Sequence, residues 1–123
     1  MLGATMVVPT IPVSDLERSK AFYGDVLGLT VLWETPASVR LRCGASSELS
    51  IFRRPGTATS HTVAHFEVVD IAAAVRDLEA KGVEFLDYTE GPLITTDHIS
   101  PLGPAFGAWF RDPDGHILGL RQG

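Results

Sequence analysis

The chain contains one pattern twice, and this repeat limits the folds that it can adopt. Val-Ser-Asp-Leu at residues 13–16 opens an amphipathic stretch that ends at Leu-Gly-Leu, residues 27–29. Val-Val-Asp-Ile at residues 68–71 opens a second such stretch, which ends at Lys-Gly-Val, residues 81–83. Repetition at this period indicates two supersecondary units joined in one chain. We therefore expect a ligand site in the space that the two units enclose.

Composition and charge exclude several classes of protein. The 123 residues are 45% hydrophobic and 20% charged, which is typical of one globular domain. The net charge of -5 and the scattered basic residues argue against nucleic-acid binding, and we expect the Arg53-Arg54 pair to end a strand in solvent. No apolar run approaches the ~20 residues that cross a bilayer, and no basic segment precedes the first apolar residues. Because Cys43 is the single cysteine, no intrachain disulfide forms. We expect a cytoplasmic protein with no nucleic-acid or membrane partner.

The first half of the chain predicts a strand, a helix and three more strands. Residues 6–13 are strand-like, and Pro9 and Pro12 place this strand at a sheet edge or a bulge, because proline cannot donate to a ladder. Ser14 and Glu17 predict a capping box at the start of the helix, and Gly28 predicts its end. Strands are then expected at residues 30–34, 38–43 and 48–53.

The second half repeats this order. A strand is expected at residues 61–68, then a helix capped by Asp70 and stopped at Gly82. Strands follow at 83–87, 105–111 and 116–121, with an Asp-Pro-Asp-Gly turn at 112–115. Residues 88–104 form a long loop, for which a lid over a ligand and a dimer contact are equally open. The prediction is an α+β fold of two βαβββ modules, about 5–54 and 61–122, joined by a linker at 55–60 in a single domain, 1–123.

Two motifs resemble a known superfamily. They are Pro-Val-Ser-Asp-Leu-Glu-Arg-Ser at 12–19, followed by Phe22 and Tyr23, and Trp-Phe-Arg-Asp-Pro-Asp-Gly-His at 109–116. With them the chain resembles the vicinal oxygen chelate superfamily, which holds glyoxalase I, extradiol dioxygenases, fosfomycin-resistance transferases and bleomycin-resistance proteins. The resemblance implies a curved mixed sheet around a cavity, with the helices outside, and a homodimer whose modules are either swapped or unswapped.

The same resemblance gives places for metal ligands, and this chain departs from the pattern there. In the metal-dependent members, one ligand comes from the first strand and one from the last strand of each module. These places fall on Val8, Val63, Gly119 and, near the start of residues 48–52, on Glu48. Three of the four carry no metal-binding side chain. The paired prolines of the first strand are also similar to the bleomycin-resistance branch.

The resemblance therefore implies a metal-independent protein without a cofactor, which binds and sequesters a hydrophobic or aromatic metabolite or antibiotic. The alternative is a metal-dependent or His-based lyase, isomerase or dioxygenase-like enzyme, with His65 and Glu67 as its acid and base. A shifted metal site of His61, His65 and Glu48 is a further possibility. The spacing opposes it, because residues i and i+4 of a strand lie ~13 Å apart.

Seven residues are the predicted ligand contacts. His61 and His65 share a strand side with Val63, because side chains alternate along a strand; the alternatives are a solvent-exposed His61 and a His65 satisfied within the core. Aromatic side chains offer flat apolar surfaces with polar edges, and whether the ring of Trp109 or that of Phe110 faces the cavity is open. The predicted contacts are Trp33, Phe52, His61, His65, Tyr88, His98 and Trp109.

Two further groups have ordinary structural interpretations. Arg40 and Arg42 share one side of a strand, which we expect to be a solvated outer face, with contact to an anionic ligand as the alternative. His116 stands in the Asp-Pro-Asp-Gly turn motif, where a local backbone contact is expected.

Overall fold

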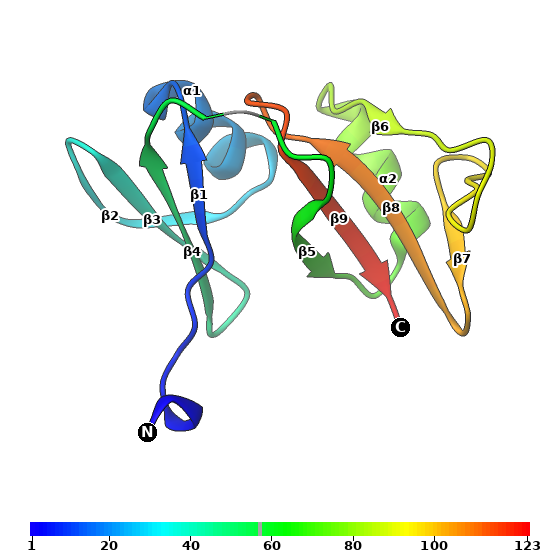
Figure 1. Cartoon of the computed structure of the whole chain (residues 1–123), viewed down its shortest axis with the longest axis horizontal. Helices are drawn as coiled ribbons and strands as arrows, with labels where there is room; N and C mark the ends of the chain where they lie inside the picture. The colour runs from blue at the N-terminus through cyan, green and yellow to red at the C-terminus, as the bar shows by residue number, and fades with distance from the viewer. Residues whose placement is uncertain (57) are drawn as a thin grey trace. The chain divides into compact units, whose positions relative to one another are not determined.

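The computed structural model describes residues 1–56 and 58–123, and the chain divides into two compact units, Met1–Thr57 and Ala58–Gly123. The division falls inside the predicted linker, residues 55–60. Each unit holds one module of helix and sheet (Figure 1). The α+β class and the doubled module are thus confirmed. The enclosed cavity and the single domain stay predictions.

The first unit forms a four-stranded sheet in the order β1-β4-β3-β2. Strand β1 lies at its edge, as its prolines predict, and runs parallel to β4, whereas the other neighbours are antiparallel. The elements are a 3-10 turn η1 (Leu2–Ala4), β1 (Thr10–Val13), α1 (Leu16–Ala21), a π-helical turn η2 (Phe22–Val26), β2 (Thr30–Thr35), β3 (Ser38–Cys43) and β4 (Ser47–Arg53).

The second unit repeats this topology in the order β5-β9-β8-β6, with β7 added beside β8. Strand β5 is parallel to β9, as β1 is to β4, and the other pairs are antiparallel. The elements are β5 (Thr62–Glu67), α2 (Ile71–Ala80), β6 (Phe85–Leu86), β7 (Ser100–Leu102), β8 (Ala105–Arg111) and β9 (Ile117–Gln122). No helix among residues 1–56 and 58–123 has both the length and the apolar character needed to span a bilayer.

The two helices begin in the same way, which gives the sequence repeat its structural meaning. Asp15 and Asp70 are the N-caps, and the carboxylate of each accepts from the backbone amide three residues on, at 3.1 Å in both cases. Such a bond satisfies one of the amides that the first helical turn leaves without a partner. The cap predicted at Asp70 is confirmed. The cap predicted at Ser14 is wrong, because Asp15 is the N-cap of α1; the Ser14 hydroxyl accepts from the Arg18 guanidinium.

In each unit the helix covers one face of the sheet. In the first unit α1 contacts β3 and β4, and in the second unit α2 contacts β8 and β9 (Figure 1). Alternate strand residues are buried on these helix-facing sides. They are Ile11, Val13, Val39, Leu41 and Ile51 in the first unit, and Ala108, Phe110, Leu118 and Leu120 in the second. We call the opposite side of each sheet its helix-free face.

Two predicted segments differ from the structure. The first strand covers only residues 10–13 of the expected 6–13; Met6 and Val7 are exposed, and their segment lies outside the sheet. The expected loop 88–104 contains β7, which pairs with β8, and a tight turn closed by Thr96 and Ile99. This strand was not predicted because it contains Pro101, and proline is a weak strand former away from sheet edges. Among the described residues β7 pairs on one side only, with β8, so it is an edge strand in which proline is tolerated.

Candidate ligand-binding site

The helix-free face of the second sheet brings together His65, Gly119 and Trp109, which lie on three neighbouring strands. His65 of β5 lies opposite Gly119 of β9, which in turn lies opposite Trp109 of β8. Residues that pair across strands project to the same side. Phe110 therefore faces the helix, where it is fully buried, and Trp109 occupies the helix-free face. The sheet face of each ring is thus known, and that the helix-free face lines a cavity stays a prediction.

The Trp109 indole lies over two glycines, of which Gly107 is in the closer contact. A methyl group added to Gly107 would lie 3.1 Å from the Cη2 and Cζ2 atoms of Trp109, and one added to Gly119 would lie 3.5 Å from its Cδ1 atom. The ring thus spans the strand surface between these two positions. Tyr88 packs against the indole edge to face, with ring centroids 5.6 Å apart, a favoured geometry for aromatic pairs. We call Trp109 and Tyr88, together with Gly107 and Gly119 beneath the indole, the aromatic corner.

Polar groups lie along β5 and β9 beside this corner. The Nε2 atom of His65 is 3.6 Å from a carboxylate oxygen of Glu67, and the Arg121 guanidinium donates to the other oxygen of Glu67 at 2.8 Å. The side chains of His65 and Glu67 are 51% and 60% exposed. His65 is therefore not the satisfied core histidine of the alternative interpretation. An exposed imidazole beside a carboxylate can donate to a ligand or exchange a proton with it.

The first sheet carries a second polar and aromatic group on its own helix-free face. Arg40 of β3 donates to Glu48 of β4 at 3.0 Å, and its guanidinium lies over the ring of Trp33. Phe52 follows two residues beyond Ser50 on the same face and is half-buried. Arg42 is exposed, as predicted, whereas Arg40 is only 24% exposed because it is held between Glu48 and Trp33.

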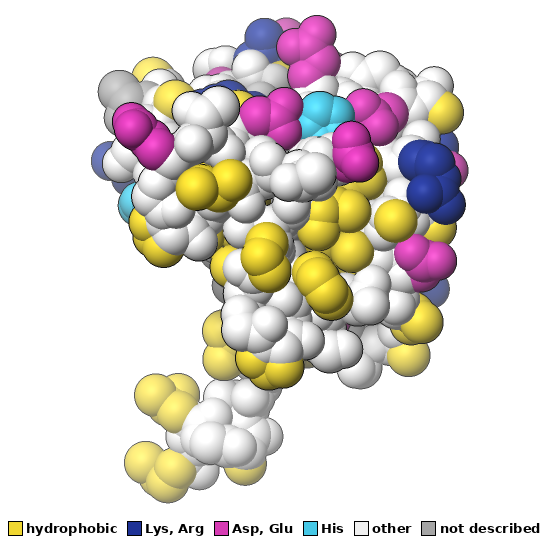
Figure 2. All heavy atoms as spheres, turned by 90° about the vertical axis from the view of Figure 1, so that its right-hand side faces the viewer, with side chains coloured by type: hydrophobic (Ala, Val, Ile, Leu, Met, Phe, Trp, Pro, Cys, Tyr) yellow, Lys and Arg dark blue, Asp and Glu magenta, His cyan; other side chains and the backbone are white. Residues whose placement is uncertain are grey.

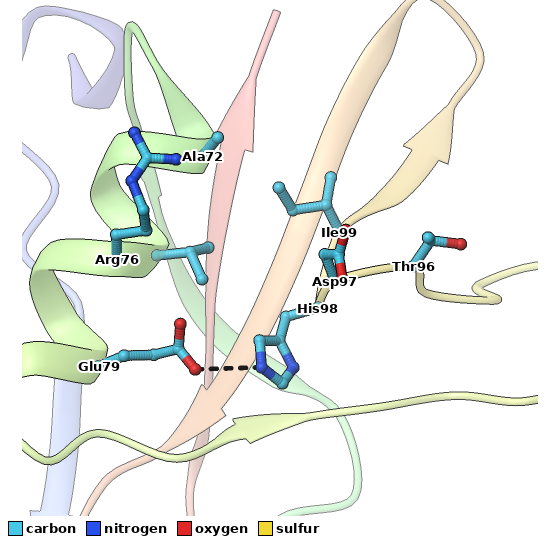
Figure 3. A pocket seen from close by; sticks show the side chains of 8 residues that line it. Ala72, Arg76, Glu79, Thr96, Asp97, His98 and Ile99 are labelled. Atoms are coloured by element: carbon cyan, nitrogen blue, oxygen red, sulfur yellow. Dashed lines mark ion pairs between the residues drawn. The ribbon is translucent and has the colours of Figure 1, made fainter.

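The remaining predicted contacts lie elsewhere in the second unit. His61 precedes β5 and is exposed. This agrees with the alternative in which His61 lies in solvent. His98 lies on the helix side, where its ring stacks on Phe85, a neighbour of the buried Phe110. It borders a groove of about 460 Å³ between α2 and the 96–99 turn (Figure 3). The expected backbone contact at His116 is present, since its amide donates to the Asp112 carboxylate at 2.8 Å.

The residues at the four places implied for metal ligands do not fit a divalent ion. Val8 and Val63 carry no donor, and the Glu48 carboxylate is engaged by Arg40. A Cβ atom at Gly119 would lie 3.2 Å from the Cβ atom of His65, so a longer acidic side chain there would require its neighbours to move. Across the described residues, no three or more His, Cys, Asp and Glu side chains are placed to hold a metal.

The register also corrects the place of the fourth ligand. Thr10 pairs with Ser50 in the first sheet as His65 pairs with Gly119 in the second, and Thr10 and His65 stand equally far before the capping aspartates. Ser50, rather than Glu48, is thus the counterpart of Gly119.

Comparison with known proteins places this fold in a family. The sequence profile of the Glyoxalase/Bleomycin resistance protein/Dioxygenase superfamily matches residues 5–120, so the chain belongs to this superfamily. No curated protein matches the chain. Many solved structures, in contrast, match the chain.

Three of these structures illustrate the range of proteins that share the fold. A glyoxalase family protein from Enterococcus faecalis is 26% identical with a TM-score of 0.74, over 98% of this chain and 99% of that one. An antibiotic binding protein from Streptomyces sp. CB03234 is 26% identical with a TM-score of 0.67, over 97% of each chain. A fosfomycin resistance protein from Listeria monocytogenes has a TM-score of 0.74 over 98% of this chain and 93% of that one, and at 16% identity it shows the fold alone.

Two parts of the site, Gly107 and Arg121, were not predicted from the sequence. Gly107 matters because it lies under the Trp109 ring, and Arg121 because it holds Glu67. A glycine inside a strand signals the close approach of another group, and this signal was available at both Gly107 and Gly119. The pairing of Arg121 with Glu67 depends on the parallel register of β5 and β9, which no local pattern encodes.

Proposed function

We propose that this protein binds a hydrophobic or flat aromatic small molecule, without a metal, on the helix-free face of its second sheet. The observation that carries the proposal is the aromatic corner, in which the Trp109 indole lies over two glycines and is flanked by Tyr88. One of these glycines, Gly119, stands where the resemblance places an acidic metal ligand. Ligand sites are commonly apolar and aromatic with a few polar anchors. His65, Glu67 and Arg121 are the anchors beside this corner.

The family supports a binding function of this kind. The Streptomyces relative, which is 26% identical, is described as an antibiotic binding protein, and we extend that class of ligand to this chain. Trp33, Phe52 and His61 remain proposed ligand contacts, whereas His98 lies on the helix side of the second sheet and is not part of the site on its helix-free face. We further propose a homodimer that works in the cytoplasm and sequesters a metabolite or antibiotic.

A thermal-shift screen against aromatic natural products tests the proposal, since a ligand that binds only the folded state raises the melting temperature. We expect hits whose affinity falls at least tenfold in Trp109→Leu. Phe106→Leu is the matched control, because Phe106 belongs to the same strand but projects to the other face and is 40% exposed. Equal losses in both variants would contradict the site.

Elemental analysis of protein purified without chelator tests the metal-free part of the proposal. We expect no stoichiometric transition metal. A molar equivalent of Ni, Zn, Fe or Mn that is needed for ligand binding would overturn it.

One observation favours a second candidate, an enzyme that uses acid-base chemistry. His65 and Glu67 lie side by side on the face that carries Trp109, and Arg121 orients the Glu67 carboxylate. A positioned imidazole transfers protons efficiently near neutral pH. Mass spectrometry of a bound ligand after prolonged incubation separates the two functions: an unchanged ligand indicates binding, and a conversion that His65→Gln abolishes indicates catalysis.

A further inference from the structure

A strained turn brings His98 into an acidic cluster. Asp97 and His98 have φ angles of 52° and 72°, backbone values that residues other than glycine adopt infrequently. The turn is closed by two backbone hydrogen bonds between Thr96 and Ile99, at 2.8 and 3.0 Å. Conformations of this kind persist when surrounding contacts hold them, and they cluster at functional positions.

The contacts that hold His98 come from two different elements. Its Nδ1 atom lies 2.9 Å from the Asp87 carboxylate, just beyond β6, and its Nε2 atom lies 3.1 Å from the Glu79 carboxylate of α2 (Figure 3). The ring also stacks on Phe85, with centroids 5.7 Å apart. Figure 2 shows a histidine among acidic side chains on the surface of the molecule. His98 therefore ties the segment after β6 to the helix.

The segment that His98 holds continues directly into the aromatic corner. Successive residues of an extended segment project to opposite sides, so Asp87 points to the helix side while Tyr88 reaches Trp109 on the helix-free face. Thr95 links the two, because its hydroxyl donates to the Asp87 carboxylate at 3.1 Å and accepts from the Tyr88 amide at 3.0 Å. Fixing Asp87 on one side of the sheet thus fixes Tyr88 on the other.

We propose that His98 is a positioning residue for the aromatic corner: by holding Asp87, it keeps Tyr88 packed against Trp109, and its protonation tightens this hold. The consequence for ligand binding rests on the function proposed above. The consequence for the packing of Tyr88 on Trp109 does not, and it is measurable in the protein without ligand.

The charges around His98 give this hold its pH dependence. Asp87 and Glu79 contact the ring, and Arg76 of α2 and Asp97 of the turn itself line the same groove. The hydrogen bond to Asp87, followed by the charges of Asp87 and Glu79, raises the pKa of His98 above its ordinary value of about 6.5, against a smaller lowering by burial. The charged contact is complete below pH 6.5 and is lost as the pH rises through the higher folded-state pKa.

Trp109 fluorescence tests the proposal. Trp33→Phe removes the other tryptophan, and His65→Gln removes the imidazole closest to Gly119 on the same face. In this double variant we expect the Trp109 emission maximum to shift to longer wavelength as the pH rises through a midpoint above 6.5, because Tyr88 leaves the indole more exposed. Adding His98→Gln is expected to abolish the transition and leave the long-wavelength emission at every pH.

The matched control is His61→Gln, which removes an exposed imidazole of the same unit and is expected to keep the transition. Asp87→Asn is a second test, which keeps His98 and the shape of the carboxyl group but removes its charge, and it should lower the midpoint. A transition that persists in His98→Gln, or no transition in the double variant, would overturn the proposal. A transition that His98→Gln abolishes, together with an unchanged ligand affinity in that variant, would instead count against the proposed ligand site and leave the positioning role of His98 intact.

Discussion

The guanidinium carbon of Arg40 lies 4.9 Å from the centroid of the Trp33 ring, and the same guanidinium donates to Glu48 at 3.0 Å. A cation over an aromatic face is attracted by the negative charge density of the ring. The carboxylate and the ring thus hold one cation in a single orientation. Among the described residues, the buried Nε atom of Arg40 has no hydrogen-bond partner, so the orientation depends on these two contacts.

The first prediction concerns this ion pair. We expect Glu48→Ala to lower the free energy of unfolding by about 1–2 kcal/mol, because it leaves a half-buried guanidinium without its carboxylate. Chemical denaturation measures the loss. Asp77→Ala on α2 is the control: its pair with Lys81 spans 3.4 Å on an exposed surface, so removing it should cost about 0.5 kcal/mol or less. Equal losses of unfolding free energy in Glu48→Ala and Asp77→Ala would show that the Arg40–Glu48 pair stabilises the fold no more than an exposed ion pair does.

The second prediction concerns the glycine under Trp109. A Cβ atom at Gly107 would lie 2.7 Å from the Cδ1 atom of Leu102 and 3.1 Å from the indole. We expect Gly107→Ala to lower the free energy of unfolding by about 1–3 kcal/mol, the usual cost of overpacking, and to change the Trp109 emission spectrum. Gly3→Ala, which meets no atom within 4 Å, should change neither.

A double-mutant cycle identifies the residue that resists the added methyl group. If the indole is the obstacle, Gly107→Ala will cost less in a Trp109→Phe background, because the smaller ring leaves space. An unchanged cost in that background would assign the strain to Leu102 instead.

The sequence predicts the repeated elements well because their signals are local. The Asp70 cap and the turn at residues 112–115 depend on contacts within a few residues, and both lie where expected; the cap of the first helix is Asp15, one residue after the predicted Ser14. The side of the sheet on which Trp109 lies was not predictable from the adjacent Trp and Phe, since either aromatic suits either face. The pairing of Gly119 with His65 and Trp109 decides it, and this register is a long-range property of three strands.

The third prediction separates the two candidate caps of α1. We expect Asp15→Ala to cost about 1 kcal/mol of unfolding free energy and Asp15→Asn to cost much less, because asparagine also caps. Ser14→Ala should cost under about 0.5 kcal/mol, since Ser14 is not the N-cap and its contact with the Arg18 guanidinium is exposed. Thermal or urea unfolding measures all three. A larger loss for Ser14→Ala than for Asp15→Ala would restore Ser14 as the cap.

The last prediction concerns stability and pH. His98 is a base whose pKa is raised in the folded state by Asp87 and Glu79, so its contribution is fully present below the unfolded-state value of about 6.5 and falls as the pH rises through the folded value. The unfolding free energy lost in His98→Gln should therefore be larger at pH 6 than at pH 8.5. Urea unfolding at both pH values measures this, with His61→Gln as the control that shows no such difference. A loss that grows with pH would mean that the folded protein favours the neutral imidazole, which two carboxylates at 2.9 and 3.1 Å oppose.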